Sequence, residues 1–355
     1  MSAALEDDAR AESIRMIRDS AAAVAPPGGD LSRIRGLRFK APGHDPATFR
    51  QLGEMGWIGL RVPEAQGGAG LGLGEACALA EELGAALVPE PLIPAMLSAS
   101  LLAAVGAGPL EALLAGTALP LVAWQERADT LEVPGTPDAP RKFLVNAAAA
   151  TSFLLPVREA DRIALYEQAG GALTLEPTQD GGTFGTLTPD LAGASRIAGD
   201  IGEALALALD EAALLTGAYL LGGMERALAM TLDYLKTRSQ FGKIIGTFQA
   251  LQHKAADVKM QIALTRASIE AAAATLDEGA TGDLRRATVS RAKARAAESA
   301  MVVTRQCIQL HGGIGYTDDY DVGLYLRKAM VMANQYGSAT LHRRRFMATS
   351  PEGEE

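Results

Sequence analysis

Two short segments of the chain carry side chains whose types and spacing suit the binding of a phosphorylated ligand. The first, residues 233–243, reads Asp-Tyr-Leu-Lys-Thr-Arg-Ser-Gln-Phe-Gly-Lys and follows a long apolar run. Arg238 presents a planar guanidinium that suits bidentate binding of a pyrophosphate, and Phe241 is placed to pack beside a ring. The alternative is an ordinary basic helix end, where Lys236 and Arg238 interact favourably with the helix dipole. The residues alone leave both interpretations open.

The second segment, residues 309–316, reads Gln-Leu-His-Gly-Gly-Ile-Gly-Tyr. In the simpler interpretation, Gly312 and Gly313 form the C-terminal cap of a helix. Two successive glycines also let a ligand approach backbone N–H groups closely. This segment is therefore a second candidate for ligand binding.

Patterns of metal-dependent and hydrolytic enzymes are missing from the sequence. The chain contains four histidines, His44, His253, His311 and His342. None lies four residues from another, so paired helical metal ligands are absent and no metal site is expected. No serine occupies a Gly-x-Ser-x-Gly elbow. Cys77 and Cys307 lie far apart, which argues against a disulfide framework and a cysteine metal site.

The glycine-rich stretch 67–74 does not match a nucleotide-binding loop. Leu73 and Glu75 occupy the positions where the dinucleotide fingerprint requires its last glycine, and no Gly-Lys-Ser/Thr follows. We expect a plain loop between helices.

Composition narrows the class of protein. The 355 residues include 33 Lys and Arg against 42 Asp and Glu, a net charge of −9, so nucleic acid is not an expected partner. The longest apolar stretch, residues 92–106, is broken by Pro94 and is too short to span a bilayer. Residues 1–8 are acidic and lack the apolar core of a signal peptide, so we expect a cytoplasmic protein without a membrane span.

The elements that must position the two segments fall into three zones, predicted as domains over residues 1–117, 118–198 and 199–355. The first zone is helical. Asp45 and Pro46 suit a helix start, and a helix is predicted over 74–84, with Cys77, Ala78, Leu79 and Leu83 inward and Glu81 and Glu82 outward.

Short apolar runs separated by Pro, Gly and Asp predict a small β domain in the second zone. The expected strands cover residues 118–124, 142–145, 152–157 and 162–166. The third zone is Ala- and Leu-rich and predicts an antiparallel bundle of four long helices. These helices are expected over residues 202–236, 247–278, 283–312 and 322–346.

Several motifs in order along the chain resemble those of acyl-CoA dehydrogenases. They are Gly56-Trp57-Ile58-Gly59-Leu60-x-Val62-Pro63-Glu64-x-x-Gly67-Gly68-x-Gly70, Glu81 to Gly84, Arg238 to Lys243, Phe248-Gln249-x-x-Gln252 with Asp257, and Gln309 to Tyr316. The resemblance implies an α+β multidomain fold: an N-terminal α-helical domain, a central β-barrel-like domain and a C-terminal four-helix bundle. It further implies bound FAD and formation of a 2,3 double bond in an acyl-CoA thioester.

This chain departs from the family pattern where the catalytic base is expected. In most relatives a glutamate in a Tyr-Glu-Gly-Thr-like motif removes the α-proton, and the aligned position here is Tyr336. In some relatives the glutamate lies on the first bundle helix, a position that falls at Ala212 here, one residue from Glu211. A shift of one residue turns a helical side chain by about 100°, so Glu211 is only a weak candidate.

A second departure concerns the flavin ring. The family's glycine- and hydroxyl-rich loop is replaced by residues 122–129, which read Val-Ala-Trp-Gln-Glu-Arg-Ala-Asp. The family residues that reach the adenosine diphosphate half of a neighbouring subunit's FAD are retained. The resemblance places them at Arg238, Gln240, Phe241, Gln249, Gln309, Gly312 and Gly313.

The resemblance therefore predicts the catalytically depleted subunit of a heteromeric acyl-CoA dehydrogenase, of the type that acts on steroid side chains. A second dehydrogenase-like chain would form an α2β2 assembly with it and supply the glutamate and the ring pocket. An electron-transfer flavoprotein is the expected acceptor. The alternatives are a self-sufficient homomeric enzyme that uses Glu211 or an acid from Asp318-Asp319, and a scaffold without activity. Residues 343–345, three arginines, are interpreted as a solvated helix face rather than a contact for CoA phosphates or a partner.

Overall fold

The computed structural model describes residues 2–350, with side chains from residue 8 onward. Residue 1, residues 351–355 and the side chains of residues 2–7 lie outside the described part. Most of residues 1–8, the segment used above to argue against a signal peptide, is therefore not described. The chain divides into two compact units. Unit 1 comprises Met1–Arg33, Cys77–Val88 and Leu214–Glu355, and unit 2 comprises Ile34–Ala76 and Pro89–Ala213. The predicted domain boundaries stay predictions.

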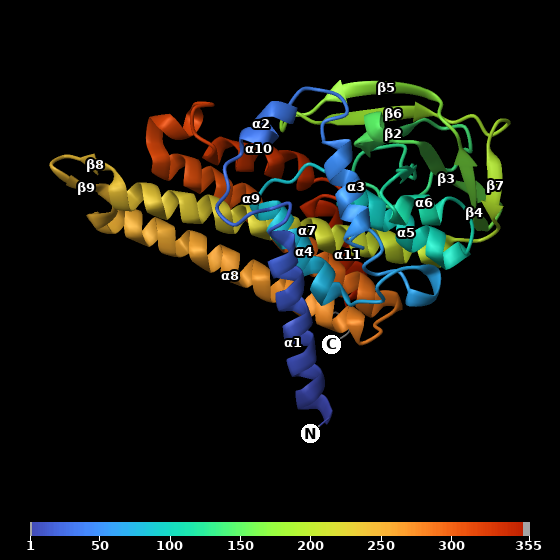
Figure 1. The fold of residues 1–355 in the computed structure, drawn as a ribbon, viewed down its shortest axis with the longest axis horizontal. Helices are drawn as coiled ribbons and strands as arrows, with labels where there is room; N and C mark the ends of the chain where they lie inside the picture. The colour runs from blue at the N-terminus through green and yellow to red at the C-terminus, as the bar shows by residue number, and fades with distance from the viewer. Residues whose placement is uncertain (1, 351–355) are drawn as a thin grey trace. The chain divides into compact units, whose positions relative to one another are not determined.

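Unit 1 is a bundle of long helices, as expected from the third zone. Its helices are α1 (Ser2–Ala21), most of α7 (Gly202–Thr237), α8 (Gln249–Asp277), α9 (Gly282–His311), α10 (Val322–Met332) and α11 (Ala339–Thr349). Helices α8, α10 and α11 all pack against α9 (Figure 1). Helix α7 meets α9 and α8 at Gly217, where a Cβ atom would lie 3.3 Å from Ala296 Cβ and 3.8 Å from Ile269 Cδ1.

The prediction of one helix over 322–346 is wrong. The chain forms α10 and α11 with a turn between them, because Tyr336 and Gly337 adopt left-handed conformations with φ values of 54° and 100°. Such conformations end an α-helix. Ser338 then caps α11 by accepting a hydrogen bond from the Leu341 amide at 3.1 Å.

Helix α4 (Leu73–Ala85) covers the predicted helix 74–84, and its C-terminal half crosses α7 within unit 1. The crossing is so close that a Cβ atom on Gly84 would lie 1.9 Å from the Tyr219 carbonyl oxygen. A Cβ on Gly222 would lie 1.8 Å from the Glu81 carbonyl oxygen. Both positions therefore require glycine.

The predicted inward residues of this helix are buried, but the outward placement of Glu81 is wrong. Glu81 is only 6% exposed, and its carboxylate forms ion pairs with Arg18 of α1 and Arg266 of α8. A pattern of apolar spacing cannot reveal an acid that is buried by basic partners distant in the sequence.

Unit 2 combines short helices with two β-sheets. Its helices are α3 (Pro46–Glu54), α5 (Leu92–Val105) and α6 (Leu110–Leu114), while α2 (Ser32–Leu37) begins at its edge. One sheet has the order β1 (Pro120–Val122), β3 (Ser152–Glu159), β4 (Arg162–Gln168), β7 (Ser195–Ala198), and the other has the order β2 (Arg141–Val145), β6 (Thr183–Thr188), β5 (Ala172–Pro177). Strand β1 pairs with β3 in parallel, and the other pairs are antiparallel. The predicted helix–β–helix fold class is confirmed, although the two sheets do not join into a closed barrel within residues 2–350.

Local signals in unit 2 are also as predicted. The Asp45 carboxylate accepts a hydrogen bond from the Ala47 amide at 3.0 Å and so caps α3. The glycine-rich stretch is a loop whose backbone bonds to the preceding segment, with the Gly70 amide 2.9 Å from the Val62 carbonyl oxygen. A Cβ on Gly68 would lie 2.0 Å from that same oxygen, so the loop needs glycine for close packing rather than for a phosphate.

Helix α7 is long and apolar enough, by length and composition alone, to cross a membrane. However, 83% of its most apolar 18-residue window is buried inside the fold. This burial is typical of a core helix in a bundle.

Candidate functional site

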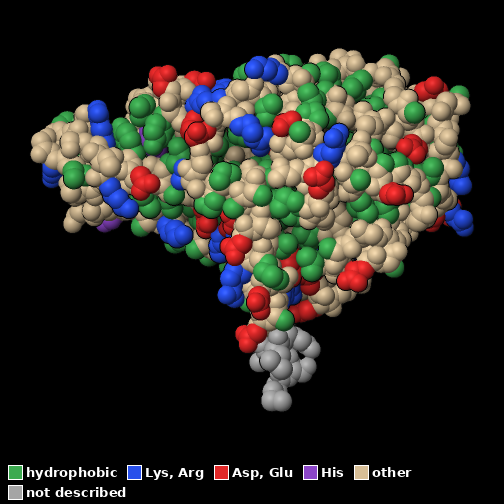
Figure 2. Space-filling view, in the orientation of Figure 1, with side chains coloured by type: hydrophobic (Ala, Val, Ile, Leu, Met, Phe, Trp, Pro, Cys, Tyr) green, Lys and Arg blue, Asp and Glu red, His purple; other side chains and the backbone are tan. Residues whose placement is uncertain are grey.

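A two-stranded hairpin follows α7 and presents the first predicted segment to solvent. Strands β8 (Ser239–Gln240) and β9 (Lys243–Ile244) are joined by Phe241 and Gly242, whose φ values of 53° and 77° define a tight two-residue turn. Phe241 is 89% exposed, and Arg238 and Gln240 are exposed beside it. Several Lys and Arg side chains lie at this end of unit 1 on the face that Figure 2 shows. The predicted ligand-binding side chains are therefore accessible.

The hairpin is held against the start of α8. The Lys243 ammonium lies 4.5 Å from the centroid of the Phe248 ring, and the Phe241 and Phe248 rings meet edge to face at 6.3 Å. The Gln252 side chain also donates to the Gly246 carbonyl at 2.9 Å. Gln249, at the first turn of α8, is exposed next to this contact.

The second predicted segment ends α9 and continues as a 3-10 turn, η4 (Gly312–Tyr316). Gly312 has φ 67° and ψ −141°, a conformation that residues with a side chain avoid. A Cβ atom on Gly312 or Gly313 would meet nothing within 4 Å, whereas one on Gly315 would lie 2.7 Å from the Ile308 carbonyl oxygen. The backbone of Gly312 and Gly313 therefore faces open space into which a ligand can approach.

His311 brings the two segments to the same end of the bundle. Its ring stacks on Tyr234 of α7, with centroids 4.7 Å apart, and lies 4.8 Å from the ring of Tyr320. Its Nδ1 donates to the Cys307 carbonyl at 2.8 Å, and burial lowers the pKa of the imidazole. The carbonyl of Tyr234 accepts the Arg238 amide at 2.9 Å, so the stack supports both segments. The sequence pattern did not identify this stack.

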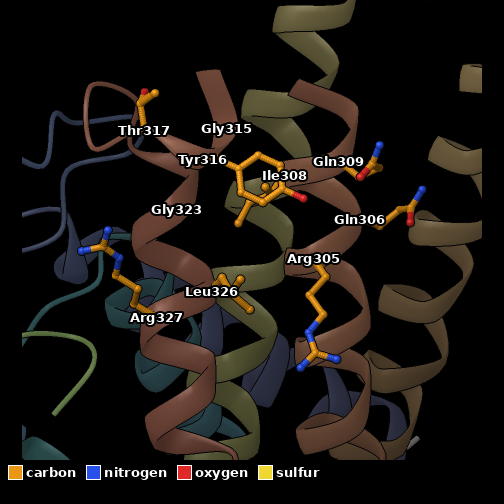
Figure 3. Close-up of a pocket in the computed structure, with 10 residues that line it drawn as sticks. All are labelled: Arg305, Gln306, Ile308, Gln309, Gly315, Tyr316, Thr317, Gly323, Leu326 and Arg327. Atoms are coloured by element: carbon orange, nitrogen blue, oxygen red, sulfur yellow. The ribbon is translucent and has the colours of Figure 1, made fainter. Parts of the chain in front are cut away.

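A cleft of about 530 Å³ opens between α9, η4 and α10 (Figure 3). Gln309 lines it, as do Arg305 and Tyr316, which the sequence did not single out. Ile308 and Leu326 form its apolar floor (Figure 3). Arg327, also at the cleft, lies 3.5 Å from the carboxylate of Asp318.

The Tyr336 turn holds the residue at the predicted base position inside the bundle. Tyr336 is 5% exposed, and burial raises the pKa of its phenol. The fully buried Lys293 ammonium donates to the carbonyls of Ala333 and Gly337 at 2.9 and 3.0 Å. His342 Nε2 donates to the Tyr336 carbonyl at 2.8 Å. The turn is thus fixed by buried donors.

The weak alternative base is also engaged. Glu211 is 6% exposed and its carboxylate lies 2.7 Å from the Arg61 guanidinium, while Ala212 is 1% exposed. Asp318 and Asp319 are exposed to solvent. The chain therefore offers no buried, unpaired carboxylate at any of these positions.

Residues 122–129, the segment that replaces the family's flavin-ring loop, bury large side chains in the interior of unit 2. Trp124 and Gln125 are 7% and 8% exposed, and the Gln125 carbonyl accepts the Lys142 amide at 2.9 Å. Among the described residues there is no group of three or more His, Cys, Asp or Glu that could hold a metal ion.

The basic run near the end of the chain lies on α11. Arg343 and Arg344 are exposed, and Arg343 forms an ion pair with Glu298. Arg345 is half-buried, with Ser290 Oγ 3.4 Å away. The interpretation as a solvated face holds for Arg343 and Arg344 only.

Comparison with known proteins identifies relatives along nearly the whole chain. Models of the acyl-CoA dehydrogenase N-terminal domain and C-terminal domain match residues 12–108 and 203–349. The chain is 32% identical over 341 residues to acyl-CoA dehydrogenase IpdE2 of Mycolicibacterium smegmatis, covering 95% of this chain and 98% of that protein.

Solved structures agree with this comparison. A variant of the Tcur3481–Tcur3483 steroid ACAD superimposes with a TM-score of 0.86 at 29% identity, covering 97% of this chain and 99% of that chain. The ChsE4–ChsE5 complex from Mycobacterium tuberculosis superimposes with a TM-score of 0.82 at 25% identity, covering 96% and 98%.

Proposed function

Because the chain belongs to the acyl-CoA dehydrogenase family, we propose that it is one subunit of a heteromeric, FAD-dependent acyl-CoA dehydrogenase. In this proposal a homologous partner chain supplies the carboxylate base and the pocket for the flavin ring. This chain completes the FAD site from the opposite side. The observation that carries the proposal is the buried Tyr336 at the position of the family's base, while Glu211 is paired with Arg61 and Asp318 and Asp319 are exposed to solvent.

The chemistry explains why that observation matters. Formation of the double bond requires a base that removes the α-proton beside the thioester. A phenol with a raised pKa stays protonated at neutral pH and cannot serve as that base. Glu211 faces Arg61 and is not available to a substrate either.

The residues at the hairpin end fit one half of FAD. Arg238 offers a bidentate donor for the pyrophosphate, exposed Phe241 offers a face for a ring, and the open backbone at Gly312 and Gly313 lets the ligand approach closely. Gln309, Gln249 and Gln240 are exposed at the same end and add polar contacts. When bound, FAD accepts the hydride that leaves the β-carbon.

The other half of FAD does not fit this chain. The segment 122–129 has no glycine loop or paired hydroxyls, and Trp124 and Gln125 fill its interior. A chain that keeps the donors for the phosphates but loses the ring pocket suits a role in completing a partner's cofactor site.

The names of the relatives support the substrate class and the assembly. One similar structure is a steroid ACAD and another is a complex of two differently named chains. We therefore propose a CoA thioester of a steroid side chain as substrate and two copies of each subunit in the assembly. An electron-transfer flavoprotein as acceptor and a cytoplasmic location complete the proposal.

The test is to purify the chain alone and together with a second acyl-CoA dehydrogenase-like chain from the same organism. We expect colourless protein from the chain alone, and flavin absorbance with acyl-CoA dehydrogenase activity from the pair. Flavin bound to the chain alone would instead favour a self-sufficient homomeric enzyme with a displaced base. Absence of flavin from both preparations would favour a scaffold.

A further inference from the structure

His311 lies between the two segments proposed to contact FAD, and its imidazole uses one of its two ring nitrogens. The side chain is 3% exposed. Its Nδ1 lies 2.8 Å from the Cys307 carbonyl oxygen, which can only accept, so Nδ1 carries the proton of the neutral ring. Its Nε2 is buried and has no hydrogen-bond partner among the residues whose side chains the structure describes. A second proton, placed on Nε2, would therefore have no acceptor.

Two tyrosine rings fix the position of the imidazole. The Tyr234 ring of α7 stacks on it at 4.7 Å with the planes 28° apart, and the Tyr320 ring, just before α10, lies 4.8 Å away. The two tyrosine rings also meet edge to face at 6.2 Å. The ring cluster of His311, Tyr234 and Tyr320 thus joins the end of α7 to the chain on either side of η4.

Both segments proposed to contact FAD are attached to this ring cluster. Gly312 directly follows His311, with φ 67° and ψ −141°, and a Cβ atom on Gly315 would lie 3.0 Å from His311 Cβ. On the other side, the Tyr234 carbonyl accepts the Arg238 amide at 2.9 Å. The position of the imidazole therefore sets both the open glycine backbone and the end of α7 that leads into Arg238.

Charged groups packed around the ring cluster act on Tyr320. Burial raises the pKa of Tyr320, the charges of Asp233 and Asp321 raise it further, and Arg226 opposes them. For His311, burial lowers the pKa of the imidazole, and the hydrogen bond from Nδ1 opposes burial in part. The surroundings of His311 thus favour its neutral form.

We propose that His311, in its neutral form, is the positioning residue of the FAD contact on this chain, and that protonation of Nε2 releases the contact. The inference rests on the proposed function, because it assigns His311 a role at the FAD site that this chain shares with a partner. A proton on Nε2 would bury a charge and an N–H without an acceptor, so the imidazole would leave its place between the tyrosine rings. The neutral arrangement is fully present above the ordinary histidine pKa of about 6.5 and is lost as the pH falls through the lowered folded-state pKa.

Two measurements on the full chain alone test this release. Nuclear magnetic resonance titration gives the pKa of the imidazole, with the His311 signals identified by their loss in His311→Phe, and we expect a value below about 6.5. Amide hydrogen exchange at residues 238–244 and 312–316 is then compared in the parent and in His311→Phe from about pH 8 to about pH 5.5, which brackets a histidine titration. Exchange in the parent should become progressively faster than in His311→Phe, because phenylalanine keeps the rings in contact and cannot titrate.

The same dependence should appear when the complex with the partner chain binds FAD. Below the pKa of the FAD-free state, the dissociation constant measured by flavin fluorescence should rise by up to about tenfold per pH unit in the parent and stay constant in His311→Phe. His311→Ala, which removes the ring, should raise it about tenfold even at about pH 8. His253→Gln, at an exposed histidine near the start of α8, is the matched control and should keep the pH dependence of the parent.

Two results from the chain alone would overturn the proposal. A pKa of His311 above about 6.5 would mean that the tyrosine rings attract the imidazolium and hold it in place. Equal pH dependence of amide exchange in the parent and His311→Phe would mean that the charge on the ring does not move the two segments. Both results stay decisive if the complex binds no FAD, an outcome that would count against the proposed function instead.

Discussion

The guanidinium of Arg61 lies 2.7 Å from the carboxylate of Glu211, and both side chains are largely removed from solvent within unit 2. Arg61 also donates to the Leu71 carbonyl at 3.0 Å. Glu211 therefore serves to hold the glycine-rich loop region to α7 rather than to face a substrate. This pairing argues against the homomeric alternative, in which Glu211 acts as the base.

Glu211→Gln tests whether Glu211 stabilises the fold or acts as the base. In the complex with the partner chain we expect turnover within about threefold of the parent, and a free energy of unfolding lowered by about 3 kcal/mol because Arg61 loses its partner charge. Steady-state kinetics and chemical denaturation measure the two effects. A loss of turnover by several orders of magnitude, with stability intact, would identify Glu211 as the base.

Arg238→Ala tests the proposed pyrophosphate contact. Loss of a bidentate charged donor costs about 1.5–3 kcal/mol, so the dissociation constant of FAD from the complex should rise about 10- to 100-fold. Flavin fluorescence during titration measures it. Lys236→Ala, two residues earlier in the same basic segment, is the control and should have a small effect. Equal effects from the two variants would mean that Arg238 only ends a helix.

Tyr336→Phe tests whether this chain holds an active proton-transfer group. The aromatic ring is kept and only the phenolic oxygen is removed, so we expect turnover of the complex to remain nearly intact. Lys293→Met serves as the contrasting variant. It leaves the carbonyls of Ala333 and Gly337 without their donor and should lower stability by about 1–3 kcal/mol. A collapse of turnover in Tyr336→Phe, with the fold unchanged, would contradict the proposal.

Much of the fold follows from local signals in the sequence. The cap at Asp45, the apolar runs that form β1 to β4 and the long Ala-rich helices depend on residues near each other in the chain. The break at Tyr336 does not follow, because a left-handed tyrosine is imposed by buried donors such as Lys293 and His342. Contacts of this kind join residues far apart in the chain, so no spacing pattern in the sequence reveals them.

The candidate site was predictable to a similar extent. Resemblance to a family located the hairpin and the glycine loop, but not the stack of His311 between Tyr234 and Tyr320 that joins them. Tyr234 and His311 lie on different helices far apart in the sequence, so their rings meet only after folding. The buried role of Glu81 was missed for the same reason, since Arg18 and Arg266 lie far away in sequence.

The lowered pKa of Glu81 predicts how the free energy of unfolding depends on pH. Burial alone would raise the pKa of its carboxyl, but hydrogen bonds and ionic attraction from Arg266 and Arg18 outweigh burial and hold the pKa below its usual value. A carboxyl with a lowered folded-state pKa stabilises the protein above its unfolded-state pKa of about 4.3. That contribution is lost as the pH falls through the folded-state pKa.

The variant Glu81→Gln isolates this contribution. At pH 7 it should lower the free energy of unfolding by about 3–5 kcal/mol, because two arginines lose a buried partner charge. Between pH 5 and pH 3, values that bracket a carboxyl titration, its stability should fall less steeply than that of the parent. Denaturant unfolding at several pH values measures both effects, and Glu278→Gln, exposed beyond the end of α8, is the matched control. Parallel pH profiles for Glu81→Gln and the parent would show that another carboxyl carries the acid sensitivity.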